Sequence, residues 1–436
     1  MAAPDARPPA PHPAAQGMMV HFNGRRGALF WLALRTGFYT ILTLGFYRFW
    51  MKTRLRRWYW SAIRPGGHPL EYVGDPWEKL LGFFIAVVIL TFYIGIVNLL
   101  LMFVSFSVFN SSMLGYLASF AGIVPLWFYA QYRARRYVLG RTRWCGVRFG
   151  LEPGAWGYAG RALMHWAITI VSLGLLWPRM TFALEKYRTD RTFFGSARLV
   201  QGGRWQMLYR AAGPFAIAAL ASAATGLWLL WWGPVVPPGA FDLNEILTGS
   251  ATAFDIDLKG MRLQDPMRLW LVPLCLAALV YGAVHYRWVA KRLMANEKSA
   301  PGLRFASRLS GPRVGVIYVL GTFIAYLVLV LGIALIVFMG VMMFGFGSTL
   351  NPELALVMAG WPQWLSVVLL AVVYISVLLM WGVMWNAFVV FPLMRHMALT
   401  TSLPDVSGLP AVSQRARDEF AEAEGFAEAL DLGAAI

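Results

Sequence analysis

Long apolar runs alternate along the chain with short segments that are rich in arginine and lysine. Eight of these runs come close to the roughly 20 residues that an α-helix needs to cross the hydrocarbon core of a bilayer. They cover residues 28–50, 79–104, 113–131, 157–180, 211–232, 269–290, 314–346 and 365–391. The pattern predicts an all-α membrane protein, built as a polytopic helical bundle.

Two of the runs are weaker than the others because charged residues, glycine or proline interrupt them. These are runs 28–50 and 157–180. The interrupting residues are Arg35, Gly45, His165, Gly174 and Pro178. Non-helical backbone at membrane depth must be shielded by protein or by a wet cavity. We therefore expect six firm transmembrane helices plus two shorter segments that are re-entrant or interfacial, and the sequence leaves open whether these two cross.

The distribution of charge predicts which side of the membrane each segment faces. Basic residues gather in segments 51–77, 132–156, 181–210 and 287–313, whereas segment 233–267 is acidic. Cytoplasmic loops of membrane proteins carry an excess of Lys and Arg. If every run crossed, one basic segment would face outside and the acidic segment inside. Letting the fourth run turn back places all four basic segments, and the C-terminus, in the cytoplasm.

Composition narrows the class of protein further. Hydrophobic residues make up 58% of the chain and charged residues 14%, which leaves more apolar surface than a soluble domain buries. The net charge of +17 raises the possibility of nucleic acid binding, but the basic residues flank apolar runs. This placement favours membrane lipids with anionic headgroups as partners, and no nucleic acid. Two cysteines cannot form a disulfide framework.

The chain carries none of the usual sequence signatures of catalysis or metal binding. It has no Walker-type phosphate loop, no HExxH, no nucleophile elbow and no Cys/His ligand spacing. No Asp or Glu lies in the middle of a firm span, which counts against an ion-coupled transporter. We expect no enzyme activity, no catalytic residue, no metal and no cofactor.

A basic motif recurs along the chain and indicates internal duplication. Its first copy contains Arg56, Arg57, Trp58, Arg64 and Gly67. The second copy contains Arg135, Arg136, Tyr137, Arg143 and Gly146, and a degenerate third copy contains Arg292, Gly302, Arg304 and Phe305. The two weak runs also share a motif, ILTLG at 41–45 and IVSLG at 170–174. The predicted unit is a hydrophobic hairpin or half-helix, a basic helix with aromatic residues, a glycine turn with a short extended piece, and a true span.

This organisation divides the chain into six parts. In order, we expect a disordered Pro/Ala-rich tail at 1–21, a first membrane repeat at 22–131, a second at 132–232, an acidic extracytoplasmic loop at 233–267, a third, degenerate repeat at 268–395 and an acidic cytoplasmic tail at 396–436.

The first copy of the motif resembles the repeat of a known family. The matching residues are Leu42 to Tyr47, Trp50 to Lys52, Arg54 to Tyr59, Arg64, Gly67 and Tyr72. They are similar to the YjgN-like bacterial inner-membrane proteins, a family of unknown function, and the resemblance runs from about Phe22 to about Arg395. Phe49 departs from the pattern, which has proline before the tryptophan. The resemblance implies a multi-pass protein of the bacterial inner membrane and supplies no reaction.

The basic helices with interleaved aromatic residues are the most distinctive chemistry in the sequence. Their cationic side chains can bind lipid phosphates while their aromatic side chains insert among the acyl chains. The candidate headgroup-binding residues are Lys52, Arg54, Arg57, Arg64, Arg135, Arg136, Arg143 and Arg292. They favour a membrane organiser or sensor that binds anionic lipid at its cytoplasmic face. The alternative is a transporter or channel for a small molecule or lipid, whose broken segments would meet beside a wet cavity.

Overall fold

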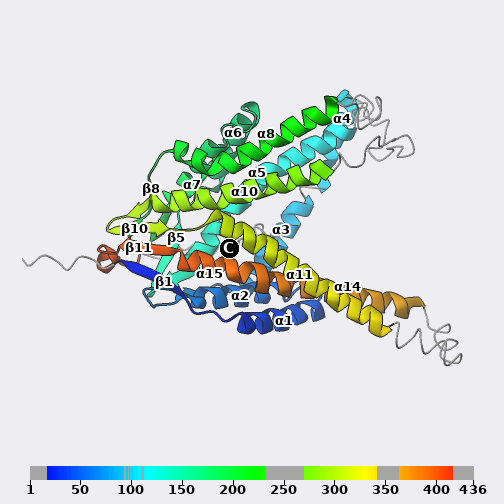
Figure 1. Ribbon diagram of the computed structural model, residues 1–436, viewed down its shortest axis with the longest axis horizontal. Helices are drawn as coiled ribbons and strands as arrows, with labels where there is room; N and C mark the ends of the chain where they lie inside the picture. The colour runs from blue at the N-terminus through cyan, green and yellow to red at the C-terminus, as the bar shows by residue number, and fades with distance from the viewer. Residues whose placement is uncertain are drawn as a thin grey trace, which may run out of the picture.

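The computed structural model describes residues 17–92, 95–96, 98–109, 112–231, 270–340 and 363–415. Long helices extend in one direction and short strands gather at the opposite end (Figure 1). The α-helices are α1 (Arg26–Leu42), α2 (Arg48–Ala62), α3 (Pro76–Phe92), α4 (Asn98–Phe109), α5 (Ser112–Gly140), α6 (Ala155–Val171), α7 (Trp177–Thr189), α8 (Tyr209–Trp231), α10 (Leu271–Asn296), α11 (Gly311–Gly340), α14 (Gln363–Trp385) and α15 (Phe391–Leu399). A 3-10 turn, η2 (Trp205–Leu208), leads into α8, and a π-helical turn, η5 (Asn386–Val390), joins α14 to α15.

Among the described residues, four helices are long and apolar enough to cross a membrane. They cover Trp205–Leu229, Leu271–Asn296, Gly311–Ala334 and Tyr374–Leu399. Large apolar side chains on them are exposed, including Leu220 at 72%, Leu274 at 66% and Val319 at 73%. Soluble proteins rarely expose this much apolar surface to water, and a bilayer would bury it. These four helices match four of the six expected spans. The other two expected spans are helical wherever the structure describes them, in α3, α4 and α5.

The expectation of a helical fold is confirmed in part: the described chain is mostly helical, but it is not all-α, because the basic segments also form β-strands. The strands are β1 (Met18–Phe22), β2 (Ile63–Pro65), β3 (Leu70–Tyr72), β4 (Thr142–Trp144), β5 (Val147–Leu151), β6 (Thr192–Phe194), β7 (Ala197–Arg198), β8 (Val200–Gln201), β9 (Lys298–Ala300), β10 (Leu303–Ser307) and β11 (Thr401–Asp405). Each is two to five residues long, too short for an alternating apolar pattern to stand out beside the long helices.

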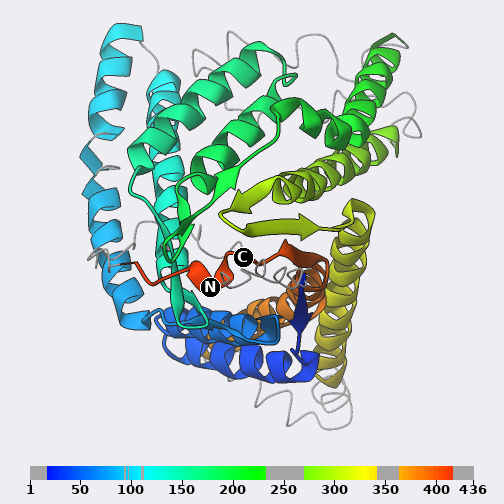
Figure 2. The same ribbon diagram turned by 90° about the vertical axis from the view of Figure 1, so that its left-hand side faces the viewer.

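The strands form two antiparallel sheets, β2-β1-β11-β10-β9-β8 and β3-β4-β5-β6-β7. The sheets meet where a tight turn joins β2 to β3 and where β7 continues into β8 after one residue, Leu199. The strands therefore follow one another around a closed ring in chain order. Pairing of β1 with β11, with Met18 opposite Leu403, brings the two ends of the described chain together. We call this element the strand ring, and Figure 2 shows it at the centre with the helices around it.

The strand ring moves two expected domain boundaries. Residues 18–21, expected in the N-terminal tail, belong to β1, and residues 401–405, expected in the C-terminal tail, form β11. The chain stays in contact with the strands as far as Arg415, which lies over the Phe193 ring of β6, and Gln414 Oε1 accepts a hydrogen bond from the Arg148 backbone N–H at 3.0 Å. Residues 1–16 and 416–436 of the two expected tails, and the whole acidic loop at 233–267, lie outside the described residues.

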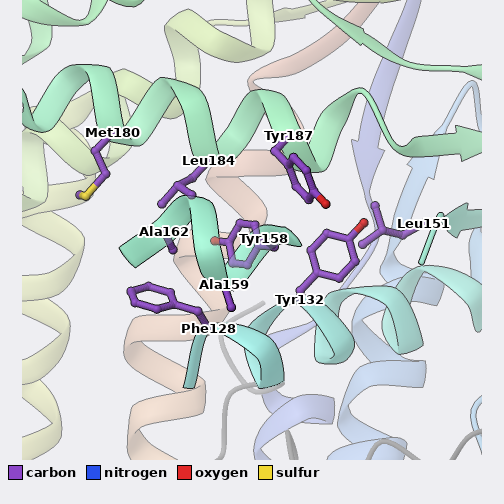
Figure 3. Close-up of a cluster of buried hydrophobic side chains, with 9 residues drawn as sticks. All are labelled: Phe128, Tyr132, Leu151, Tyr158, Ala159, Ala162, Met180, Leu184 and Tyr187. Atoms are coloured by element: carbon purple, nitrogen blue, oxygen red, sulfur yellow. The ribbon is translucent and has the colours of Figure 1, made fainter. Parts of the chain in front are cut away.

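A buried cluster of aromatic residues holds α5, α6 and α7 together. Tyr132, Tyr158 and Tyr187 pack between the three helices, with ring centroids 5.4–6.0 Å apart (Figure 3). The Tyr132 hydroxyl donates to the Glu152 carbonyl at 2.7 Å, and the Tyr187 hydroxyl donates to the Gly154 carbonyl at 3.0 Å. The loop between β5 and α6 is thereby fixed, and so is the direction in which α6 leaves the strand ring.

Candidate functional site

Each of the two weak apolar runs is a pair of helices joined by a tight turn. Run 28–50 divides into α1 and the start of α2, and run 157–180 into α6 and the start of α7. Both α1 and α6 contain 17 residues, which at 1.5 Å per residue gives about 26 Å, less than the ~30 Å of the hydrocarbon core. We call these pairs the first and second helix hairpins. In Figure 1 the first hairpin ends well short of the far end of α14.

The turns at the two hairpin tips have the same geometry. Leu44 and Gly45 have φ of 51° and 94°, and Leu173 and Gly174 have φ of 50° and 85°. The Gly45 N–H donates to the Thr40 carbonyl at 2.7 Å, as the Gly174 N–H does to Thr169 at 2.8 Å. Glycine in this left-handed conformation is a common way to end a helix, because it has no Cβ to clash. Gly45 and Gly174 therefore act as the turn residues of the two hairpins.

Both tips present apolar side chains outward. Leu44 is 90% exposed and Leu173 is 93% exposed, and Phe46 and Leu175 are exposed beside them. An exposed arginine follows each tip, Arg48 on α2 and Arg179 on α7. Sequence reasoning missed these two arginines, although each follows its turn glycine closely, by three residues in the first hairpin and by five in the second, which was a usable signal.

The other residues predicted for the two weak runs have different environments. Arg35 is exposed on α1, and Pro178 is buried in the first turn of α7, where proline fits the helix geometry. His165 is buried on α6 with a 9% exposed side chain.

Two of the three predicted cations of α2, Arg54 and Arg57, are exposed, and Arg57 also stabilises the fold. Arg54 is exposed, and its guanidinium lies 5.7 Å from the centre of the Tyr47 ring. Arg57 donates to the Gly74 carbonyl at 2.9 Å and so ties α2 to the loop after β3, while Lys52 is half-buried.

The same helix carries a buried cation that sequence reasoning did not place in the site. Arg56 is 6% exposed and Lys79, on α3, is 3% exposed. Arg56 donates to the Tyr72 hydroxyl at 3.2 Å, and Lys79 donates to Thr53 Oγ1 at 3.2 Å. Both cations also lie over the Tyr72 ring, at 5.2 and 5.4 Å from its centre. The buried charges thus join α2, β3 and α3.

Arg135 belongs to a group of charged side chains around Glu185, which we call the Glu185 cluster. Glu185 on α7 is 12% exposed and lies 2.6 Å from Lys298 of β9, 2.7 Å from Arg188 and 3.6 Å from Arg135 of α5. Burial alone would raise the pKa of this carboxyl, but Lys298, Arg135 and Arg188 hold it well below its usual range. The carboxylate is therefore charged, and it connects three parts of the strand end.

The remaining predicted cations are spread over other elements. Arg64 lies on β2 opposite His21, and Arg143 lies on β4 opposite Glu71 and Arg148. Arg292 on α10 donates to the Leu309 carbonyl at 3.3 Å, and Arg136 is half-buried on α5. The structure does not bring the eight predicted cations into one site. All eight lie on the strand ring or on helices that lead into it.

Within the described residues, no three His, Cys, Asp or Glu side chains lie close enough together to hold a metal ion. The expectations of no enzyme activity and no cofactor stay predictions.

Comparison with known proteins places the chain in a family. Residues 18–336, nearly three quarters of the chain, match a family described as "Bacterial protein of unknown function (DUF898)". No curated protein and no solved structure matches the chain. The match covers the strand ring from β1 to β10, both helix hairpins and most of the long apolar helices. The chain belongs to the DUF898 family of bacterial proteins of unknown function.

Proposed function

We propose that this protein is a multi-pass protein of the bacterial inner membrane that binds anionic lipid at its basic, cytoplasmic end and acts there as a membrane organiser or sensor. The observation that carries the proposal is the pair of helix hairpins, each with an exposed apolar tip and an exposed arginine close behind it. The resemblance to YjgN-like proteins implies the same location.

The position of the strands supports a topology of six spans and two hairpins. Every strand lies at one end of the helices in Figure 1. If that end stays on one side of the bilayer, each excursion of the chain between strands must return to the same side. The excursions α3–α5, α8–α10 and α11–α15 then provide three pairs of spans, and α1–α2 and α6–α7 provide the two hairpins that do not cross. The recurrence of helix, strand hairpin and helix supports the predicted internal duplication.

Charge supports the cytoplasmic placement of the strand end. Arg64, Arg143, Arg198 and Arg304 lie on strands, and the basic helices α2, α5 and α7 lead to or from them. Basic segments remain preferentially in the cytoplasm. With this orientation, both hairpins enter the bilayer from the cytoplasmic leaflet, which is the leaflet with a negative surface potential.

The spacing within each hairpin suits an anionic headgroup. Arg48 follows Leu44 by four residues and Arg179 follows Leu173 by six, which corresponds to about 6 and 9 Å along a helix. Interfacial helices bury their apolar face ~5–10 Å into the boundary between headgroups and acyl chains. A tip inserted to that depth leaves each arginine near the phosphates, and the long side chain can extend toward them. Arg54, on the same helix as Arg48, adds a further exposed charge.

We expect the double variant Arg54→Gln/Arg179→Gln to lose selectivity for anionic lipid. A cation near an anionic surface contributes ~1 kcal/mol, so each substitution should weaken the association of phosphatidylglycerol by about fivefold. The measurement is the association constant of spin-labelled phosphatidylglycerol relative to phosphatidylcholine in reconstituted bilayers. Raising the salt concentration should weaken the wild type more than the variant.

Arg198→Gln is the matched control. Arg198 is an exposed arginine on the strand ring that pairs with Glu152 at 3.0 Å, away from both tips. Lipid selectivity should be unchanged in this variant. Equal losses in the control and the double variant, or no loss in the double variant, would contradict lipid binding at the hairpins. The transporter or channel alternative has no specific observation in its favour among the described residues and stays a prediction.

A further inference from the structure

A cavity of about 290 Å³ lies at the base of the first helix hairpin, where α1 packs against α14 and η5. We call it the α1 cavity. Its walls include Arg26 and Gly27 of α1, Val328 of α11 and Phe388 of η5. Three parts of the chain that are far apart in the sequence therefore form one site, and one of them is a π-helical turn, a feature found frequently at functional sites.

The α1 cavity lies among the most apolar helices of the protein. Val328 belongs to the helix Gly311–Ala334, and Phe388 belongs to Tyr374–Leu399, two of the helices that are long and apolar enough to cross a membrane. Val328 is 37% exposed there. If these helices span the bilayer as proposed, lipid chains surround them and are the apolar groups available to fill the cavity. At the ~30 Å³ of a water-sized group, the volume holds about ten non-hydrogen atoms, which is part of one acyl chain.

Among the described residues on its walls, the charged one is Arg26. Arg26 is exposed, and its guanidinium lies 5.4 Å from the centre of the Phe388 ring and 5.6 Å from that of Phe391. Contacts of this kind hold a guanidinium in place without neutralising its charge. The first turn of α1 contains no acidic residue, and no carboxylate among the described residues pairs with Arg26. Because cations among membrane helices almost always pair, the site calls for an anion.

The charge and the apolar part of the α1 cavity lie at different depths. Arg26 follows the end of β1 by four residues, and Phe391, which its guanidinium contacts, begins the short helix that leads to β11. Val328 lies 17 residues beyond the start of α11, about 26 Å along the helix from the end nearest β10. Arg26 is thus on the strand-ring side of the cavity. An amphiphile with its head at Arg26 would direct its chain away from the ring and into the bilayer.

We propose that the α1 cavity binds one anionic phospholipid, with the phosphate on Arg26 and part of one acyl chain between α1, α11 and η5. The phosphate supplies the missing negative charge, and the planar guanidinium matches its geometry. Arg25 precedes Arg26 and is also exposed, so a second positive charge favours a lipid with net negative charge over a zwitterionic one. The proposal rests on the proposed membrane location and does not involve the hairpin tips.

The test is native mass spectrometry of the full-length protein in detergent, mixed with equal amounts of phosphatidylglycerol and phosphatidylethanolamine. We expect the wild type to retain one molecule of phosphatidylglycerol under activation that removes the other lipids. Arg26→Gln should bind this molecule about fivefold more weakly. Inorganic phosphate should not displace it, because the acyl chain contributes to binding. Displacement by phosphate, or no retained lipid in the wild type, would overturn the proposal.

Two further variants test the place of the acyl chain. A Cβ at Gly27 meets nothing within 4 Å, and leucine is a better helix former than glycine, so Gly27→Leu should fold. Val328→Phe enlarges an exposed apolar side chain on another wall. Each variant fills part of the cavity and should weaken retention of phosphatidylglycerol about threefold or more. Retention that neither variant weakens would contradict a chain in this cavity.

Arg395→Gln is the matched control for Arg26→Gln. Arg395 is an exposed arginine on α15 that is not on the cavity wall, so the retained lipid should be unchanged. Equal losses in the two variants would indicate a general effect of surface charge and overturn the proposal. The hairpin experiment measures selectivity for many lipids in a bilayer, whereas this one counts a single retained molecule. The failure of one is therefore distinguishable from the failure of the other.

Discussion

Replacing Glu185 by alanine is expected to lower the free energy of unfolding by ~3–5 kcal/mol, the range for removing one partner of a buried ion pair. The reason is that the positive charges around Glu185 would lose their negative partner. Lys298, Arg188 and Arg135 approach this carboxylate from β9, α7 and α5. Without it, three positive charges lie close together at a partly buried site. Denaturant-induced unfolding of the purified protein in detergent measures the loss.

Glu152→Ala is the control for this experiment. Glu152 pairs with Arg198 at 3.0 Å, but the two side chains are 32% and 58% exposed. Solvent screens such a pair, and its removal should change stability by ~0–1 kcal/mol. Similar losses in the two variants would contradict the importance of the Glu185 cluster.

The pH dependence of stability provides an independent signature of the same carboxylate. Its pKa in the folded protein lies well below the ordinary value of 4.5. A depressed pKa contributes stability that is fully present above the unfolded pKa and is lost as pH falls through the folded pKa. The wild type should therefore lose this contribution only below pH 4.5, and Glu185→Ala should lack that part of the acid transition.

The second large effect is expected where α8 and α10 cross. Gly282 of α10 is buried against α8, and a Cβ added there would lie 2.6 Å from Phe215 Cα and 3.0 Å from Phe215 N. These are backbone atoms, so the helices themselves must separate. We expect Gly282→Val to lower stability by ~1–3 kcal/mol or more, as overpacking a tight contact does. The midpoint of unfolding in denaturant measures it.

Gly226→Val is the matched control, because Gly226 lies on α8 and a Cβ there meets nothing within 4 Å. Since glycine is a poor helix former, this variant should be neutral or slightly more stable. A midpoint that falls as far in Gly226→Val as in Gly282→Val would show that the close crossing is not what the substitution disturbs.

Much of the membrane part of the fold could be predicted from the sequence, because crossing a bilayer requires long apolar helices. Four of the expected spans correspond to helices of suitable length and hydropathy. The turns at Gly45 and Gly174 were also predictable, since glycine and charge interrupt an apolar run there, and both glycines adopt positive φ.

The strands could not be predicted in the same way. The pairing of β1 with β11 joins residues near position 20 to residues near position 400. A contact between residues so far apart cannot be predicted from a local sequence pattern. The short strands instead owe their stability to closure of the ring and to glycine turns such as Gly146 and Gly302, which both have positive φ.

The site was predicted least well because a sequence does not reveal what a cation contacts. Arg57 and Arg292 are basic residues in the basic segments, as expected, but each donates a hydrogen bond within the protein, to the carbonyl of Gly74 and of Leu309 respectively. Glu185 gave no signal of its own, since its importance depends on three cations from different elements.

Labelling of Cys145 tests most directly whether the strand ring lies in the cytoplasm. Cys145 is exposed in the turn between β4 and β5, so one thiol reports on the side occupied by the ring. The other cysteine, Cys275, is half-buried in α10 and can be replaced by serine. Partial burial raises the pKa of the Cys145 thiol, as does Glu71 to a lesser extent, so labelling should accelerate as pH rises toward the thiol pKa.

The measurement is the reaction of Cys275→Ser with a membrane-impermeant maleimide, in intact spheroplasts and in inverted membrane vesicles. The proposed orientation predicts labelling of Cys145 in inverted vesicles and none in intact spheroplasts. Labelling of Cys145 from outside intact spheroplasts would place the strand ring on the exterior face and contradict the topology and the lipid site together.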